Sequence, residues 1–173
     1  LHTTFTISSG DIGASHYLYD HLRLLQYYSL GNIKELAKKI TLDNAMLNYL
    51  DNTQNNANNP NENYAREFLE LFTITKGEQI GEGDYSTYTE DDVIMAAKVF
   101  SGFKTKLDRT IIDPDTGIPM GRISVIQHDQ STKTFSHAFD NYQLAGGTDE
   151  NTIMSELHEF VDMIFDKEAT ARA

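Results

Sequence analysis

The spacing of hydrophobic residues along the chain predicts a mainly helical protein. In several stretches apolar residues return every three or four positions, which is typical of a helix that buries one face. Between these stretches the sequence is polar and rich in Asn, Asp and Gly, which favours loops. The helices predicted in this way cover residues 15–30, 32–40, 43–50, 60–72, 89–102 and 148–165.

Capping residues mark the starts of two of these helices. Thr89 is followed three residues later by Asp92, which is the spacing of a capping box. Pro60 suits the first position of the helix at 60–72, and we expect Asn59 before it to be the N-cap. Both helices should therefore begin at fixed points.

Residues 103–127 interrupt the helical pattern. The Asp-Pro-Asp-Thr-Gly segment at 113–117 is a turn signal, and apolar and polar residues alternate over 123–127, which predicts a short strand or hairpin. Residues 73–88 are Gly-rich and polar, so we expect a loop there. The prediction is one irregular helical domain over residues 1–173 with a small β-hairpin insertion at 103–127.

The composition of the chain argues against several classes of function. The formal net charge is -12, which would repel a phosphate backbone, so we expect no nucleic-acid partner. The chain has no cysteine, which excludes disulfides, thiol catalysis and zinc–thiolate sites. No apolar run approaches the roughly 20 residues of a membrane-spanning helix, and we expect no transmembrane segment in this chain.

An Asn-rich segment at 51–63 has the spacing of a calcium loop. An EF-hand supplies oxygen ligands from positions 1, 3, 5, 7, 9 and 12 of a loop between two helices. Asn56, Asn58 and Pro60 depart from that pattern, so a solvated loop capped by Asn59 is the simpler alternative, which we favour. Counted from the first residue of the segment, the candidate calcium ligands are Asp51, Thr53, Asn55, the carbonyl of Ala57, Asn59 and Glu62.

The polar face of the helix at 60–72 is a second candidate site. Glu67 and Glu70 lie one turn apart, where two carboxylates can hold a divalent metal or act as an acid and a base. Arg66 lies four residues from both Glu62 and Glu70, which also suits a solvated row of ion pairs. On spacing alone, the row of ion pairs is the more common arrangement.

A third candidate is the His128-Asp129 pair, which is followed by Lys133. Functional side chains commonly project where a strand ends, although a His-Asp pair also occurs often by chance. The remaining histidines, His2 among them, show no metal-ligand spacing. No serine-hydrolase elbow, dinucleotide-binding motif or P-loop motif is present.

Several blocks resemble a known family. Residues 60–73, Pro-Asn-Glu-Asn-Tyr-Ala-Arg-Glu-Phe-Leu-Glu-Leu-Phe-Thr, resemble the central signature of a widespread bacterial family labelled as domain of unknown function 1800. Thr4 stands where this family usually has a second His, and Phe103 stands where it usually has Trp. Further resembling blocks, in the same order as in the family, lie at 1–5, 43–47, 49–52, 88–93, 101–103, 128–135 and 169–172.

The resemblance implies an exported bacterial protein, placed in the periplasm, at the outer membrane or outside the cell. It implies that this chain is a central fragment of a longer family domain, and the inserts at 77–88 and 104–127 resemble those of Bacteroidetes members. The family has no settled activity to carry over. The resemblance singles out the following residues as candidates for a role: Asp51, Asn52, Asn61, Glu62, Asn63, Arg66, Glu67, Glu70, His128, Asp129 and Lys133.

Two hypotheses follow. The first, which we favour, is an exported cell-envelope protein with a structural or binding role, with calcium or another divalent metal as a candidate stabilising ion. Its partners would be the rest of its own chain and other envelope proteins. The second is an exported metal-dependent hydrolase, in which Glu67 and Glu70 converge with His128 and Asp129, and with His2 as a further candidate.

Overall fold

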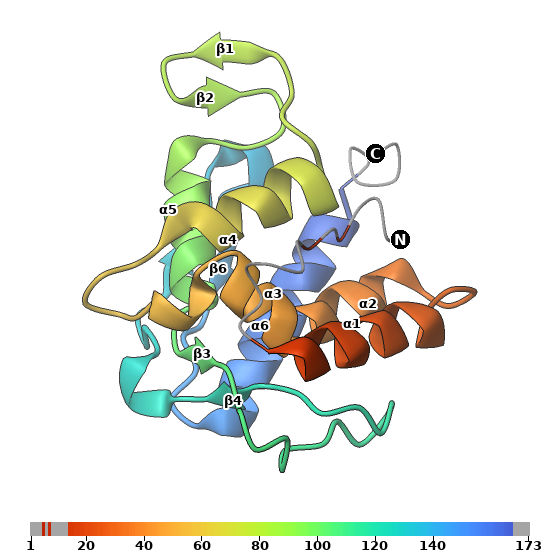
Figure 1. Ribbon diagram of the computed structural model, residues 1–173. Helices are drawn as coiled ribbons and strands as arrows, with labels where there is room; N and C mark the ends of the chain where they lie inside the picture. Colours follow the sequence, from red (N-terminus) through yellow and green to blue (C-terminus); the bar gives the residue numbers. More distant parts are fainter. Residues whose placement is uncertain (1–4, 6, 8–13, 168–173) are drawn as a thin grey trace.

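The computed structural model describes residue 5, residue 7 and residues 14–167, and most of its regular structure is helical (Figure 1). Long irregular segments separate the helices, so the expected irregular, mainly helical fold is confirmed in outline. The helices are α1 (Ser15–Tyr27), α2 (Ile33–Ile40), α3 (Asn44–Tyr49), α4 (Glu62–Glu67), α5 (Glu90–Val99) and α6 (Glu150–Phe165).

The strands are short and form three separate antiparallel pairs. In the described residues, single 3-10 turns lie between the longer elements, at Asn52–Gln54, Val125–Gln127 and His137–Phe139. The pairs are β1 (Gln79–Gly81) with β2 (Asp84–Tyr85), β3 (Phe103–Lys104) with β4 (Arg122–Ile123), and β5 (Lys133–Thr134) with β6 (Gln143–Leu144).

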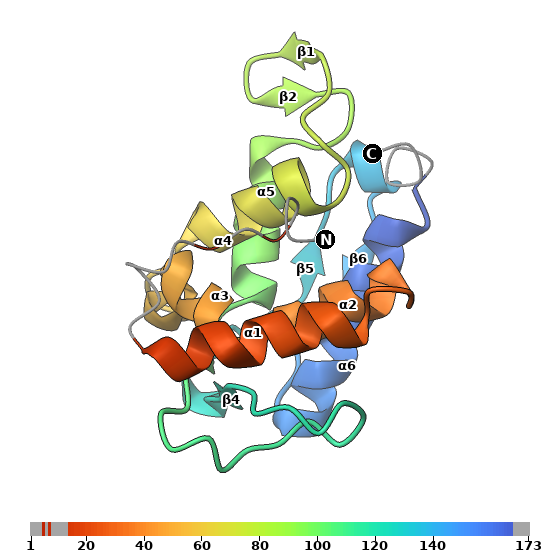
Figure 2. The ribbon, with the colours of Figure 1, turned by 45° about the vertical axis from the view of Figure 1, so that its right-hand side comes forward.

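The core lies where α4, α5 and α6 meet. Phe68, Phe100 and Phe160 are each fully buried, and their ring centroids are 5.1 to 5.9 Å apart. Tilted and edge-on aromatic pairs of this kind add to the stabilisation from buried area. α2 packs against α6 and α1 packs against α3, which places these helices around the core (Figures 1 and 2).

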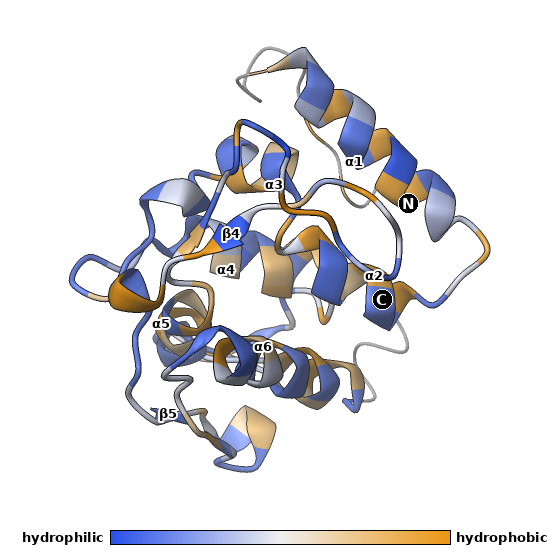
Figure 3. Cartoon of the chain, turned by 90° about the horizontal axis from the view of Figure 1, so that it is seen from below, coloured by the Kyte–Doolittle hydropathy of each residue, from blue (hydrophilic) through white to orange (hydrophobic). Residues whose placement is uncertain are grey.

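α1 mixes polar and apolar residues along its whole length (Figure 3). Leu24 and Leu25 are buried against the core, whereas Tyr19, Leu22 and Tyr27 are exposed. One face of α1 therefore packs against the protein, and the opposite face keeps apolar side chains at the surface.

One predicted helix start is confirmed and the other is wrong. The Thr89 hydroxyl accepts a hydrogen bond from the Asp92 N–H, and the Asp92 carboxylate accepts one from the Thr89 N–H, so α5 has the expected capping box. The N-cap of α4 is Asn61 instead of the predicted Asn59, and the helix begins at Glu62. The Asn55 side chain accepts a hydrogen bond from the Asn61 N–H at 3.0 Å, which holds Asn61 at the N-cap and leaves Pro60 outside the helix.

The helix that begins with α4 extends to Phe72, as predicted, but its last turn is a π-helix over Phe68–Phe72. The Ile74 N–H donates to the Leu69 carbonyl, five residues back, and the Thr73 hydroxyl donates to the Phe68 carbonyl at 2.7 Å. The wider turn is thus closed by the residues that follow it. Single π-turns of this kind are frequent at functional sites.

The predicted β insertion is hairpin-like mainly at its base. β3 pairs with β4, and a single bridge joins Ile112 to Pro119, but the intervening chain is irregular. The strand expected over 123–127 is wrong, because β4 ends at Ile123 and a 3-10 turn follows. The Ser124 N–H donates to the Gly102 carbonyl there, which turns the chain out of the strand.

Residues 73–88, expected to be a loop, contain the β1–β2 hairpin. It projects from the end of the molecule that carries the first turn of α5 (Figures 1 and 2). Its strand β1 is exposed along its length. In the described residues, no helix combines the length and the hydropathy needed to cross a membrane.

Candidate functional site

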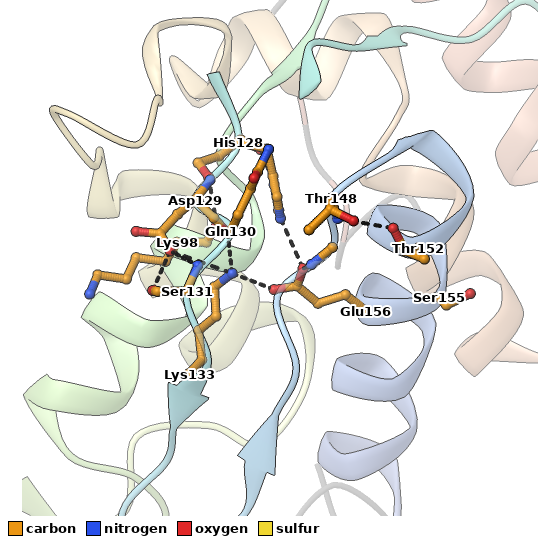
Figure 4. Close-up of polar contacts among 12 residues, drawn as sticks. Lys98, His128, Asp129, Gln130, Ser131, Lys133, Thr148, Thr152, Ser155 and Glu156 are labelled. Carbon is orange, nitrogen blue, oxygen red and sulfur yellow. Dashed lines mark hydrogen bonds and ion pairs between the residues drawn. The ribbon is translucent and has the colours of Figure 1, made fainter. Parts of the chain in front are cut away.

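A buried polar network joins the segment at 128–133 to α6 (Figure 4). We call it the Glu156 network; it consists of His128, Lys133 and Glu156. Glu156 Oε2 lies 2.9 Å from His128 Nε2, and Glu156 Oε1 lies 2.7 Å from the Lys133 ammonium. All three side chains are at most 1% exposed. Buried charges persist only when they are paired, and these three residues supply each other's partners.

The His128 ring lies between a carbonyl and a carboxylate. Its Nδ1 is 2.8 Å from the Ser101 carbonyl oxygen, which can only accept, so Nδ1 carries a proton. A second proton lies between Nε2 and Glu156. The pair is therefore an imidazolium beside a carboxylate, or a neutral imidazole beside a carboxylic acid. In either state both ring nitrogens are engaged, and neither is free to bind a metal.

Two glycines allow the backbones around this network to come close. Gly102 has a φ of +80°, and a Cβ there would lie 2.9 Å from the His128 nitrogen. Gly147 donates its N–H to Glu156 Oε2 at 2.6 Å, and a Cβ at Gly147 would lie 2.4 Å from the Ile153 nitrogen. Any side chain at either position would push apart the segments that carry the network.

Asp129 lies at the edge of the network and is partly exposed. Burial alone would raise the pKa of its carboxyl, but hydrogen bonds from Ser131 and the nearby Lys133 and Lys98 charges hold that pKa below its usual value. The Lys133 ammonium donates to the Asp129 carbonyl oxygen. Asp129 is thus an ionised carboxylate that shapes the turn at 128–133.

The polar face of α4 carries a second network, which we call the Arg66 network; it consists of Glu62, Arg66, Glu70 and Glu90. The Arg66 guanidinium bonds both carboxylate oxygens of Glu90, at 3.1 and 2.8 Å, and also contacts Glu62 at 3.2 Å. The hydrogen bonds from Arg66 hold the pKa of Glu90 below its usual value. The row of ion pairs that the spacing favoured is therefore present, and it ties α4 to the start of α5.

Glu70 makes two contacts beyond its ion pair with Arg66. Its carboxylate accepts a hydrogen bond from the Tyr88 hydroxyl at 2.5 Å and lies 3.4 Å from the Lys76 ammonium. Burial raises the pKa of the Tyr88 phenol, and the Glu70 carboxylate raises it further. Glu70 therefore fixes the segment that leads into α5.

Glu67 stands apart from the other candidates. It makes no hydrogen bond or ion pair with the residues that the structure describes. Burial raises the pKa of its carboxyl, and the neighbouring Glu70 raises it further. Glu67 is thus the one candidate carboxylate on α4 that the described contacts leave unused.

The Asn-rich loop packs against the C-terminal end of α5. The side-chain amide of Asn55 donates to the Ala97 carbonyl at 2.8 Å, and that of Asn52 donates to the Phe100 carbonyl at 3.1 Å. The last carbonyls of a helix lack partners within it, so these two buried amides complete the end of α5. The segment is therefore a buried connection as well as a surface loop.

A lysine ammonium occupies the centre of that loop. Lys104 Nζ donates to the Thr53 carbonyl at 2.6 Å and to the Asn55 carbonyl at 2.9 Å. Two other candidate calcium ligands are engaged in separate contacts: the Glu62 carboxylate accepts a hydrogen bond from Arg66, and the Asp51 carboxylate accepts one from the Gln54 side chain. These contacts differ from the converging oxygens of an EF-hand.

The structure thus distributes the predicted site residues over three places. His128, Asp129 and Lys133 lie together, Glu67 and Glu70 lie on α4 and the π-turn that continues it, and the Asn-rich loop forms the third group. Over residue 5, residue 7 and residues 14–167, no group of three or more His, Asp or Glu side chains could hold a metal ion. His2 lies outside the described residues.

The sequence analysis missed Glu156, although the sequence contains a signal for it. Glu156 falls three residues after Ile153 and four before Phe160, so it lies on the apolar face of α6. A lone carboxylate among buried positions requires a partner. His21 follows the same rule on α1, where its Nδ1 lies 2.8 Å from the buried Asp43 carboxylate.

The family model described as Protein of unknown function (DUF1800) matches residues 1–173. The chain belongs to this family. No curated protein and no solved structure matches the chain. Membership explains the signature over 60–73, which the structure shows as the start of α4, its π-turn and the Arg66 network.

Proposed function

We propose that this DUF1800 chain is a structural or binding part of an exported cell-envelope protein, with the rest of its own chain and other envelope proteins as partners. The proposal rests on one observation: the polar residues that the family resemblance singles out join segments that are far apart in the sequence. Arg66 links α4 to Glu90, and His128 and Lys133 link the turn at 128–133 to Glu156 on α6. Side chains that link distant segments in this way hold the fold together, which is a structural role.

The alternative is an exported metal-dependent hydrolase that uses Glu67, Glu70, His128 and Asp129. It would require these groups to converge around a metal with an open coordination position. The described contacts of Glu70 are with Tyr88, Arg66 and Lys76, and both His128 nitrogens are engaged elsewhere. This geometry favours the structural or binding role.

The metal question has a direct test. The protein is dialysed against Zn²⁺, Mn²⁺ or Ca²⁺, then against metal-free buffer, and the retained metal is measured by elemental analysis. We expect no stoichiometric metal. A metal that wild type retains, and that both Glu67→Gln and His128→Gln lose, would overturn the proposal in favour of the hydrolase.

Calcium at the Asn-rich loop is tested separately by thermal unfolding. A ligand that binds the native state must raise its stability. Because Lys104 already supplies the cation for the Thr53 and Asn55 carbonyls, we expect the same midpoint with EDTA and with added calcium. A calcium-dependent rise in wild type that disappears in Asp51→Asn would assign a calcium site to the loop.

The exported location rests on the family resemblance and has its own experiment. An antibody raised against this chain would detect the native protein in cell fractions of the source bacterium. We expect it in the periplasmic, outer-membrane or secreted fraction, accessible to protease after the outer membrane is permeabilised. Recovery in the cytosolic fraction alone would contradict the proposal.

A further inference from the structure

A cavity of about 370 Å³ lies beside α2 and α6, outside these networks. Residues 105–121, which we call the strap, connect β3 to β4 (Figure 2). Strap residues between Ile111 and Gly121 form the outer wall of the cavity. The side chains of Lys38 and Lys39 on α2, and of Met154 and His158 on α6, form the inner wall. The volume lies within the range of small-molecule sites, roughly 300–1,000 Å³.

The strap is fixed in place at several points. Arg109 forms two hydrogen bonds, at 3.0 and 2.8 Å, with the fully buried carboxylate of Asp20 on α1. Near its end, the Gly121 N–H donates to the Leu42 carbonyl at 2.7 Å. Two-point contact between guanidinium and carboxylate fixes orientation as well as distance. The cavity is therefore preformed, which lowers the entropic cost of binding.

Acidic and basic side chains nearly balance in the cavity wall. The Lys39 ammonium lies 2.6 Å from the Asp113 carboxylate and 2.5 Å from that of Asp115. The adjacent Lys38 lies 3.0 Å from Asp162 and 3.1 Å from Glu35. The other charged residues of the lining are Asp43, Arg122 and Glu150. No large excess of one sign is therefore present to attract an ion.

The rest of the wall is mostly apolar. Leu24, Leu42, Ile118, Met120 and Met154 supply aliphatic and thioether surface. His158 Nε2 is buried and has no hydrogen-bond partner in the described structure, so this nitrogen does not face the cavity. Burial lowers the pKa of His158, and the Lys38 charge lowers it further, which keeps the imidazole neutral.

We propose that this cavity binds an uncharged, mostly apolar small molecule. The apolar wall would enclose the body of the ligand, and the neutral His158 ring would form part of that wall. The proposal rests on the binding role proposed above and assigns that role a place and a ligand class. Its test does not depend on the metal experiment, so either proposal can fail without the other.

The test uses N-phenyl-1-naphthylamine, an uncharged aromatic amine whose fluorescence rises in apolar surroundings. We expect saturable binding of one probe per chain. Its sulfonated relative 1-anilinonaphthalene-8-sulfonate has similar rings and a negative charge, and we expect its affinity to be at least about tenfold weaker. Equal affinity for the two probes would overturn the uncharged ligand class.

Two cavity-filling variants locate the probe. Met154→Trp fills the cavity from α6 and Met120→Trp fills it from the strap, so each should weaken probe binding by at least about tenfold. Leu30→Ser removes a fully exposed apolar side chain that does not line the cavity and should leave binding unchanged. As a control, the urea unfolding transition of each variant is measured to check that the variant is folded.

His158→Phe keeps an aromatic ring in the wall and removes both ring nitrogens, so binding of the mostly apolar probe should persist. Binding that survives both tryptophan variants, or that is lost in Leu30→Ser, would overturn the cavity as the site. The absence of saturable binding in wild type would overturn it as well. Loss of binding in a folded His158→Phe would show that the probe needs a polar contact and would overturn the ligand class.

Discussion

The Glu156 network and the Arg66 network both pair carboxylates with basic side chains but lie in opposite surroundings. In the Glu156 network the three side chains are 0% to 1% exposed, whereas those of Arg66, Glu62 and Glu90 are 32%, 43% and 37% exposed. Each network joins parts of the chain that are distant in sequence. The difference between them is the access of water.

Water access decides what each network contributes to stability. Exposed ion pairs are screened, and their attraction is largely offset by the entropy lost in ordering long side chains. A buried pair is costly to form, and removal of one partner leaves the other charge without water or counter-ion. The Glu156 network should therefore be essential to the fold, and the Arg66 network should mainly set the approach of α4 to α5.

The largest effect is expected for Glu156→Ala. This change leaves the Lys133 ammonium and the His128 ring without their buried carboxylate and should lower the free energy of unfolding by about 3–5 kcal/mol. Urea unfolding measures the loss. The control is Glu159→Ala on the same helix, which removes only a bond with Tyr142 at the surface. Similar losses in the two variants would show that burial does not separate these sites.

Lys104→Met should have the next largest effect. It leaves the Thr53 and Asn55 carbonyls without their ammonium partner and should lower the free energy of unfolding by about 1–3 kcal/mol. Lys106→Met is the matched control, because Lys106 contacts Asp108 at the surface. A variant as stable as the control would mean that the Asn-rich loop does not depend on Lys104.

Arg66→Gln tests the exposed network directly. We expect a loss of less than about 1 kcal/mol in dilute buffer. In about 1 M NaCl, where the screening length is only about 3 Å, most of that difference from wild type should disappear. A salt-independent loss as large as that of Glu156→Ala would place the two networks in the same energetic class.

The smallest effect concerns pH and His158. Burial lowers the folded-state pKa of His158, so the unfolded chain binds this proton more readily. The stabilising contribution of neutral His158 is complete above the unfolded-state pKa of about 6.5, and it is lost as the pH falls from there towards the lowered folded-state pKa. As the pH is lowered, the free energy of unfolding should therefore fall less steeply in His158→Gln than in wild type.

Denaturant unfolding of wild type and His158→Gln at a series of pH values between about pH 7 and about pH 5 gives the two slopes. If His158→Gln and wild type have the same slope, His158 is solvated in the folded protein, and the description of the cavity wall must change.

The sequence predicted those features that depend on neighbours along the chain. The helical spacing, the capping box of Thr89 and Asp92, and the ion pairs of Arg66 with Glu62 and Glu70 all involve residues within four positions of each other. The family resemblance singled out His128 and Lys133 but did not indicate that Glu156 is their partner. The N-cap of α4 was misplaced because Asn55, six residues before Asn61, fixes where that helix begins.

The candidate site depended on contacts that no local pattern contains. Glu156 lies 28 residues from His128, and Lys104 lies 51 residues from Thr53. The strand expected over 123–127 failed for the same reason, since β4 ends where Ser124 turns to bond Gly102. The one available signal was a carboxylate on the apolar face of α6.

By itself, the sequence determined that this chain is acidic, mainly helical and free of cysteine chemistry, because those properties follow from composition and from spacing within single elements. Only the tertiary structure decided which charges are buried, which carbonyls the loop amides satisfy, and where a cavity remains. Each of these depends on the exclusion of water between segments that are distant along the chain. Burial then turned similar side chains into a buried network at Glu156 and a screened one at Arg66.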